Sequence, residues 1–155
     1  MSDNVSRGAV QAFYEAFASR DPVRVGQLLA DDVEWNMSGP VDVFPFCGPR
    51  RGKAAAMEYL GRGVPSLFAI KRYEPLEMVI DGDCAATFSK VTAVQRETGR
   101  IITFHSAHFV RFRDGKVTSM KSITDTFLVA EQVVGHRIDA YREPEFDLLQ
   151  DVVAL

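Results

Sequence analysis

Three tight-turn signals in the second half of the chain constrain its fold more than any other feature of the sequence. They are DGD at 81–83, ETGR at 97–100 and RDGK at 113–116, and runs of strand length lie between them. Glycine next to Asp or Thr is typical of the two-residue turns of β-hairpins. The pattern predicts four antiparallel strands in a meander, at roughly 72–80, 84–96, 101–113 and 116–125.

The first half of the chain has helical periodicity instead. Apolar residues recur at helical spacing from Val10 to Phe17, and Asp21-Pro22 predicts the start of a second, shorter helix. Residues 33–37, VEWNM, alternate like a short strand, and after a loop rich in Pro and Gly the residues 53–62 are again helical in pattern. Helices followed by a meander predict the α+β class.

Size and composition fit one globular domain. The chain has 155 residues, of which 46% are hydrophobic and 25% charged, and this suits a single core. We expect the domain to span residues 1–135 and a C-terminal extension, with a short helix after Pro144, to span 136–155. The net charge of -3 provides no basic surface for nucleic acid, so we expect no nucleic-acid partner.

The sequence also predicts a location. Its first residues lack the basic stretch and apolar core of a secretion signal, and no apolar run reaches the roughly 18 residues of a membrane span. Cys47 and Cys84 lie far apart, without the spacing of a metal site, and suit free thiols in a reducing compartment. We therefore expect a cytoplasmic protein with no membrane partner.

The turns also predict which side chains share a face of the sheet. If each turn is a two-residue loop, the register is fixed, and Ser89, His108 and Lys121 lie side by side on three adjacent strands. Polar groups within an apolar surface need partners, so these three either bond to one another in the core or line a pocket. The predicted pocket-lining residues of this face are Met78, Ser89, Phe104, Ser106 and Lys121, beside His108 as a candidate catalytic residue.

His105 and His108 point to opposite faces, because side chains alternate along a strand. The two histidines cannot share a metal ion, and no other ligand spacing is visible, so we expect neither a metal nor a cofactor. The face with His105 also carries Phe88 and Phe109, and no predicted helix remains to cover it. We expect a homodimer through this outer face.

The order of these segments resembles a known family. AVQAFYEAFASRDPVRVGQLLADDVEW, then GKAAAMEYL, then strands ending in HFVRFRDGKV and SITDTFLVAEQ are similar to the SnoaL-like, ketosteroid isomerase-related branch of the nuclear transport factor 2-like superfamily. The resemblance covers about residues 5–135. It implies a cystatin-like α+β fold: a cone-shaped, curved antiparallel sheet wrapped around N-terminal helices, with a deep apolar pocket and usually a homodimer.

The resemblance also implies roles for single residues. Tyr14 matches the tyrosine that donates a hydrogen bond to the substrate oxygen in the isomerases, although it also suits the core. Met37, which we also expect to line the pocket, stands where those isomerases have the aspartate that moves the proton, and a thioether cannot replace that base. His108 matches their second acid, and Asp125 matches an acidic residue that serves as a base in many SnoaL-like proteins. Asp125 could equally cap the chain that follows.

Two functions remain open at this point. The first is a cofactor-independent acid–base enzyme, an isomerase, cyclase or hydratase/hydrolase, in which His108, Asp125 and Tyr14 act on a small hydrophobic molecule. The second is a module of the same fold that binds a ligand or a protein without turnover. Trp35 either walls the pocket or belongs to the core, and Lys121 either neutralises an anionic substrate or lies at the rim.

Overall fold

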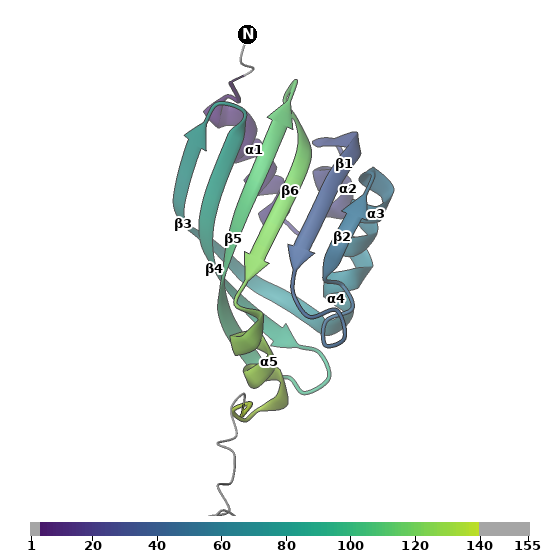
Figure 1. Cartoon of the computed structure of the whole chain (residues 1–155), viewed down its shortest axis with the longest axis vertical. Helices are drawn as coiled ribbons and strands as arrows, with labels where there is room; N and C mark the ends of the chain where they lie inside the picture. Colours follow the sequence, from purple (N-terminus) through teal and green to yellow (C-terminus); the bar gives the residue numbers. More distant parts are fainter. Residues whose placement is uncertain (1–3, 140–155) are drawn as a thin grey trace, which may run out of the picture.

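The computed structural model describes residues 4–139. A six-stranded sheet in the order β2-β1-β6-β5-β4-β3 curves around the N-terminal helices, which lie behind it in Figure 1. The predicted α+β class is confirmed. In chain order the elements are α1 (Arg7–Ala18), α2 (Pro22–Gly26), β1 (Leu29–Ser38), β2 (Gly48–Arg51), α3 (Lys53–Glu58), the π-helical turn η1 (Tyr59–Gly63), α4 (Val64–Leu67), β3 (Phe68–Asp81), β4 (Cys84–Gln95), β5 (Ile101–Arg113), β6 (Lys116–Thr124) and α5 (Thr126–Val134).

Both helices predicted in the N-terminal part of the chain are present, and each has a side-chain cap. The Ser6 hydroxyl accepts a hydrogen bond from the Ala9 amide at 3.1 Å and caps α1, and Asp21 caps α2 by accepting from the Val23 amide at 2.9 Å. The apolar stripe of α1 is buried, with Val10 and Phe13 fully inaccessible. This stripe packs into the curve of the sheet and forms one wall of the core.

The predicted meander is present as β3 to β6, but its middle turn is longer than two residues. The Gln95 amide donates to the Arg100 carbonyl at 2.8 Å, so four residues separate the strands at this end. The pairing of β4 with β5 is therefore displaced by two positions, and His108 lies opposite Thr87 instead of Ser89. A displacement of two leaves every side chain on its predicted face, because the strand period is two.

An irregularity in β6 reverses which of its side chains point inward and which point outward. Arg111 pairs with Ser119 and Phe112 with Val117, so one extra residue, Thr118, enters the strand. Every side chain after it is inverted relative to the prediction. Met120, Ser122 and Thr124 point inward, whereas Lys121 is exposed. The prediction that Lys121 lies beside His108 is wrong for this reason, and the candidate base Asp125, which follows β6, is exposed.

A second irregularity, in β3, brings an unpredicted aromatic residue inward. Pro75 pairs with Ser89 and Glu77 with Phe88, which leaves Leu76 as the extra residue, 52% exposed. Proline has no amide hydrogen to donate and is found in strands chiefly at edges and bulges. Beyond the bulge, Tyr73 turns toward the core.

The remaining strands complete the sheet, and α5 follows its last strand in the sequence. β1 lies parallel to β6 and forms a short hairpin with β2, and β3 begins beside α4 and sweeps to the far edge of the sheet (Figure 1). α5 follows β6 and was not predicted; it ends at Gly135 in the left-handed conformation, φ 80°. The helix predicted after Pro144 lies outside the described residues. None of the helices in residues 4–139 is long and apolar enough to cross a bilayer.

Candidate functional site

A cavity of about 430 Å³ lies between the inner face of the sheet and the helices. Its walls are mostly apolar, with aromatic rings from α1, from the 39–47 loop and from β3, and its size suits a small organic ligand. Polar groups enter it mainly from β5 and β6. The residues that matter for its chemistry are Phe17, Arg20, Met37, Tyr73, Phe104, Ser106, His108, Ser122 and Thr124.

His108 is the centre of the polar part of this cavity. Its side chain is 3% exposed, and both ring nitrogens have hydrogen-bond partners. Nδ1 lies 3.2 Å from the Tyr73 hydroxyl, and Nε2 lies 3.2 Å from the Ser106 hydroxyl. Phe17 contacts the imidazole edge-on, with the ring centroids 5.3 Å apart.

The hydrogen bonds continue beyond His108 on both sides. The Ser89 hydroxyl donates to the Tyr73 oxygen at 2.9 Å, and the Ser106 hydroxyl lies 3.1 Å from that of Thr124. A neutral imidazole has one donor and one acceptor nitrogen. In one consistent arrangement, the Tyr73 hydroxyl donates to Nδ1 and Nε2–H donates to the Ser106 oxygen. Both nitrogens of a neutral His108 then have a hydrogen-bond partner.

His108 is neutral at physiological pH. Burial lowers the pKa of its imidazole to about 3, and the positive charge of Arg20 lowers it further in the same direction. At pH 7 the ring can thus donate a hydrogen bond from one nitrogen and accept one at the other, but it does not carry the extra proton of an imidazolium. His108 therefore lacks the titration near neutral pH on which histidine usually relies as a general acid or base.

Tyr14 lies beside His108 without lining the cavity. The two rings are stacked with centroids 6.2 Å apart, and the Tyr14 hydroxyl bonds the Thr87 hydroxyl at 2.9 Å. Burial raises the pKa of this phenol well above its usual range. In the structure, therefore, Tyr73 presents its hydroxyl at the cavity, whereas that of Tyr14 is engaged behind the imidazole.

The other predicted site residues divide between cavity, core and surface. Met37, Phe104 and Ser106 line the cavity. Trp35 lies in the core, where its ring stacks on that of Phe17 with the centroids 6.3 Å apart. Met78, on β3, packs against the core and is not among the cavity-lining residues. Ser89 is buried and does not line the cavity; its hydroxyl is hydrogen-bonded to the hydroxyl of Tyr73, which does.

Lys121 and Asp125 lie outside this group. Both are exposed, and the Asp125 carboxylate accepts a hydrogen bond from the Leu128 amide at 3.0 Å as the N-cap of α5. Capping is one of the two roles that the sequence left open for Asp125. The geometry brings no carboxylate to His108, since no Asp or Glu of the described chain lines the cavity.

The cavity residues that sequence reasoning missed include Phe17, Ser122, Thr124, Tyr73 and Arg20. The signal for Tyr73 was Pro75, because a proline inside a strand indicates a bulge that inverts the residues on one side of it. Arg20 follows α1 in the left-handed conformation, φ 59°, and turns back over Phe17. No sequence pattern predicts that turn. Within residues 4–139, no three His, Cys, Asp or Glu side chains gather as metal ligands would.

Comparison with known proteins gives consistent matches. Residues 10–120 match the model of the SnoaL-like domain. A presumed isomerase from Rhodopseudomonas palustris superposes with a TM-score of 0.77 at 28% identity, covering 85% of this chain and 100% of its own. TerC, crystallised with polyporic acid, gives 0.73 at 28% identity over 82% and 96% of the two chains. A nuclear transport factor 2-like protein from Burkholderia thailandensis gives 0.72 at 23% identity over 81% and 95%. No curated protein matches significantly.

Proposed function

Because the chain belongs to the SnoaL-like domain family, with the resemblance seen in its sequence confirmed, we propose that its cavity binds a small, mostly apolar molecule by an oxygen atom. Tyr73 and His108 hold that oxygen. The observation that carries the proposal is a neutral, buried imidazole hydrogen-bonded to a tyrosine hydroxyl in a mostly apolar cavity. Convergent polar groups of this kind commonly fix the orientation of a ligand.

We further propose that the bound molecule is converted by acid–base chemistry without a cofactor. The Tyr73 hydroxyl can turn from His108 toward a ligand oxygen and stabilise negative charge that develops there, and a water-poor cavity strengthens this effect. Nδ1 of His108, which that turn leaves free, accepts the proton lost by the ligand or by an attacking water, because an imidazolium beside a new oxyanion is stabilised as an ion pair. Isomerisation, cyclisation, hydration and hydrolysis all include such a step.

The comparisons support binding of a ring-containing molecule. One similar structure is a presumed isomerase, and another, TerC, was crystallised with polyporic acid. Both are 28% identical to this chain and are covered almost completely by it.

Binding without turnover is the second candidate. It is favoured by the identity of Met37, which cannot accept a proton, and by the absence of any Asp or Glu from the cavity lining in the described part of the chain. In that case Tyr73 and His108 serve only to orient the ligand.

A thermal-shift screen tests the proposal. The wild-type protein, His108→Ala and the surface control His105→Ala are heated with small ketones, lactones, epoxides and aromatic acids, since a ligand of the folded state raises the melting temperature. A compound that stabilises the wild type and His105→Ala, but not His108→Ala, supports the site. Equal stabilisation of all three proteins, or of none by any compound, contradicts it. Product analysis with each hit then separates turnover from binding.

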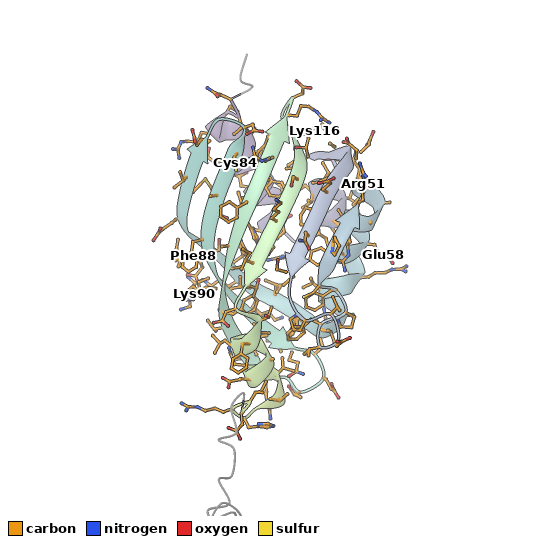
Figure 2. The ribbon with its side chains drawn as sticks, in the orientation of Figure 1. Arg51, Glu58, Cys84, Phe88, Lys90 and Lys116 are labelled. Atoms are coloured by element: carbon orange, nitrogen blue, oxygen red, sulfur yellow. The ribbon has the colours of Figure 1, made fainter. Side chains whose placement is uncertain are left out.

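We also propose that the outer face of the sheet pairs with a second copy of the chain. Four apolar side chains on this face, Val79, Phe88, Phe109 and Ile123, are 40% to 64% exposed, and His105 stacks on Phe88 at 5.0 Å. Phe88 is labelled in Figure 2, on the side of β4 away from α1.

The free thiols of Cys47 and Cys84 suit a reducing compartment such as the cytoplasm.

A further inference from the structure

The guanidinium of Arg20 lies at the cavity wall in an unusual setting for a cation. It is stacked over the Phe17 ring at 4.7 Å and approaches the Tyr73 ring at 5.5 Å. These contacts place the charge on aromatic faces, where cation–π attraction replaces part of its hydration. Tyr73 also contacts His108, with ring centroids 6.0 Å apart, so one aromatic ring separates the guanidinium from the imidazole.

Arg20 has no anionic partner in residues 4–139. Its Nε atom is buried and makes no hydrogen bond to the described protein, and none of the ion pairs found there includes Arg20. An unpaired donor costs free energy when it is buried, and a charged one costs more. Burial accordingly lowers the pKa of this guanidinium, although Arg remains protonated.

The cavity as a whole has a positive charge balance. Arg20 and Arg96 are the charged residues among its described lining, and neither Asp nor Glu contributes to it. Arg96 is exposed and its Nε already donates to the Pro65 carbonyl. Of the two, Arg20 is therefore the cation whose guanidinium makes no hydrogen bond or ion pair with the described chain.

We propose that Arg20 binds the carboxylate of the cavity ligand, which makes that ligand a small organic acid with an aromatic or branched apolar body. A guanidinium presents parallel donors that match the two oxygens of a carboxylate, and such a pair is strongest where water is excluded. The inference rests on the proposed function, because the body of the acid fills the same cavity and lies against Tyr73 and His108. It adds the class of substrate.

Matched pairs of acids and amides test this assignment. Benzoate and benzamide, cinnamate and cinnamamide, and naphthalene-2-carboxylate and its amide have nearly equal shapes but differ in charge. Binding is followed by the fluorescence of Trp35, the single tryptophan, which stacks on the cavity residue Phe17, and by calorimetry. We expect at least one acid to bind the wild type ten-fold or more tightly than its amide.

Variants assign that preference to a residue. Arg20→Gln should reduce the preference to two-fold or less, Arg20→Lys should retain part of it, and melting curves and circular dichroism verify that both fold. Arg24→Gln, an exposed change on α2, is the matched control and should leave the preference unchanged.

The outcomes separate this inference from the proposed function. Acids and amides that bind the wild type equally, or a preference that survives in Arg20→Gln and disappears in Arg96→Gln, overturn the role of Arg20 but leave the cavity as a ligand site. Absence of binding by every acid and every amide overturns both.

Discussion

The Tyr73 hydroxyl meets Nδ1 of His108 at 3.2 Å across an intervening strand. Tyr73 belongs to β3 and His108 to β5, and β4 lies between them in the sheet. The contact is possible because the bulge at Leu76 turns Tyr73 inward and because the sheet is curved. A shift of Tyr73 by one position in the register would point it to the other face of the sheet and remove its hydroxyl from His108.

Replacing Tyr73 should affect ligand binding, whereas replacing Tyr14 should affect only stability. Each change to Phe removes a buried hydrogen bond and should lower the free energy of unfolding by about 1–2 kcal/mol. Tyr73→Phe should also weaken binding of a cavity ligand by about ten-fold, which corresponds to the same range of energy. Denaturant unfolding and calorimetry measure the two effects. Equal loss of affinity in both variants would contradict the assignment of the cavity hydroxyl to Tyr73.

The low pKa of His108 predicts a specific dependence of stability on pH. The unfolded chain binds a proton at this residue below about pH 6.5, whereas the folded protein does so only near pH 3. Protons therefore favour the unfolded state in this window. The stability contribution is present above pH 6.5 and falls by about 1.4 kcal/mol per pH unit as the pH decreases toward 3.

His108→Gln isolates this contribution. Between pH 7 and pH 5 the wild type should lose about 2 kcal/mol more than the variant does, as measured by urea unfolding. His105→Gln, an exposed change on the opposite face of β5, is the matched control. Parallel pH profiles for the wild type and His108→Gln would show that the imidazole is not held neutral.

Asp125 should act as a helix cap and not as a base. Asp125→Ala removes the hydrogen bond to the Leu128 amide and should destabilise the protein by about 1 kcal/mol, while Asp125→Asn should retain most of the stability. Neither change should alter turnover or ligand affinity beyond two-fold. Loss of turnover in a folded Asp125→Asn protein would restore the catalytic role that the family resemblance implies.

The outer face of the sheet should control association. His105→Ala weakens the stack on Phe88 and should shift a dimer toward monomer, with little effect on ligand affinity, whereas His108→Ala should do the reverse. Phe109→Glu, which buries a charge if this face is an interface, should abolish the dimer. Sedimentation at several concentrations measures this. If the Phe109→Glu protein is still a dimer, the interface is on another surface and the proposal for the outer face is wrong.

The sequence allowed the four strands of the meander, the core of β1 and the two N-terminal helices to be predicted because their signals are local, whereas β2 lies in the stretch that was expected to be a loop. Asp21-Pro22 caps α2, and the turns after Asp81 and Arg113 have the predicted length. Alternation along β5 correctly separated His105 from His108. The signals for α5, Asp125 at its start and Gly135 at its end, are also local and were present in the sequence.

The candidate site was harder to predict because its register depends on bulges. Thr118 has no distinguishing chemistry, yet its insertion moves Lys121 outward and Ser122 inward. A one-residue slip inverts every later side chain, so an error at one position removed two of the predicted site residues. The direction of the Arg20 side chain depends on packing against Phe17 and Tyr73, which no pattern along the chain encodes.

The ring nitrogens of His108 offer the most direct test of the central claim, that a neutral imidazole in the cavity contacts the ligand. The chain has three histidines, so ¹⁵N NMR spectra of histidine-labelled protein can be assigned with single variants. At pH 7 we predict the spectrum of a neutral ring for His108, and a change in its nitrogen shifts, without a comparable change at His105 or His136, when a hit from the thermal screen is added. A charged His108 ring, or shifts that do not move while the ligand binds, would contradict the account.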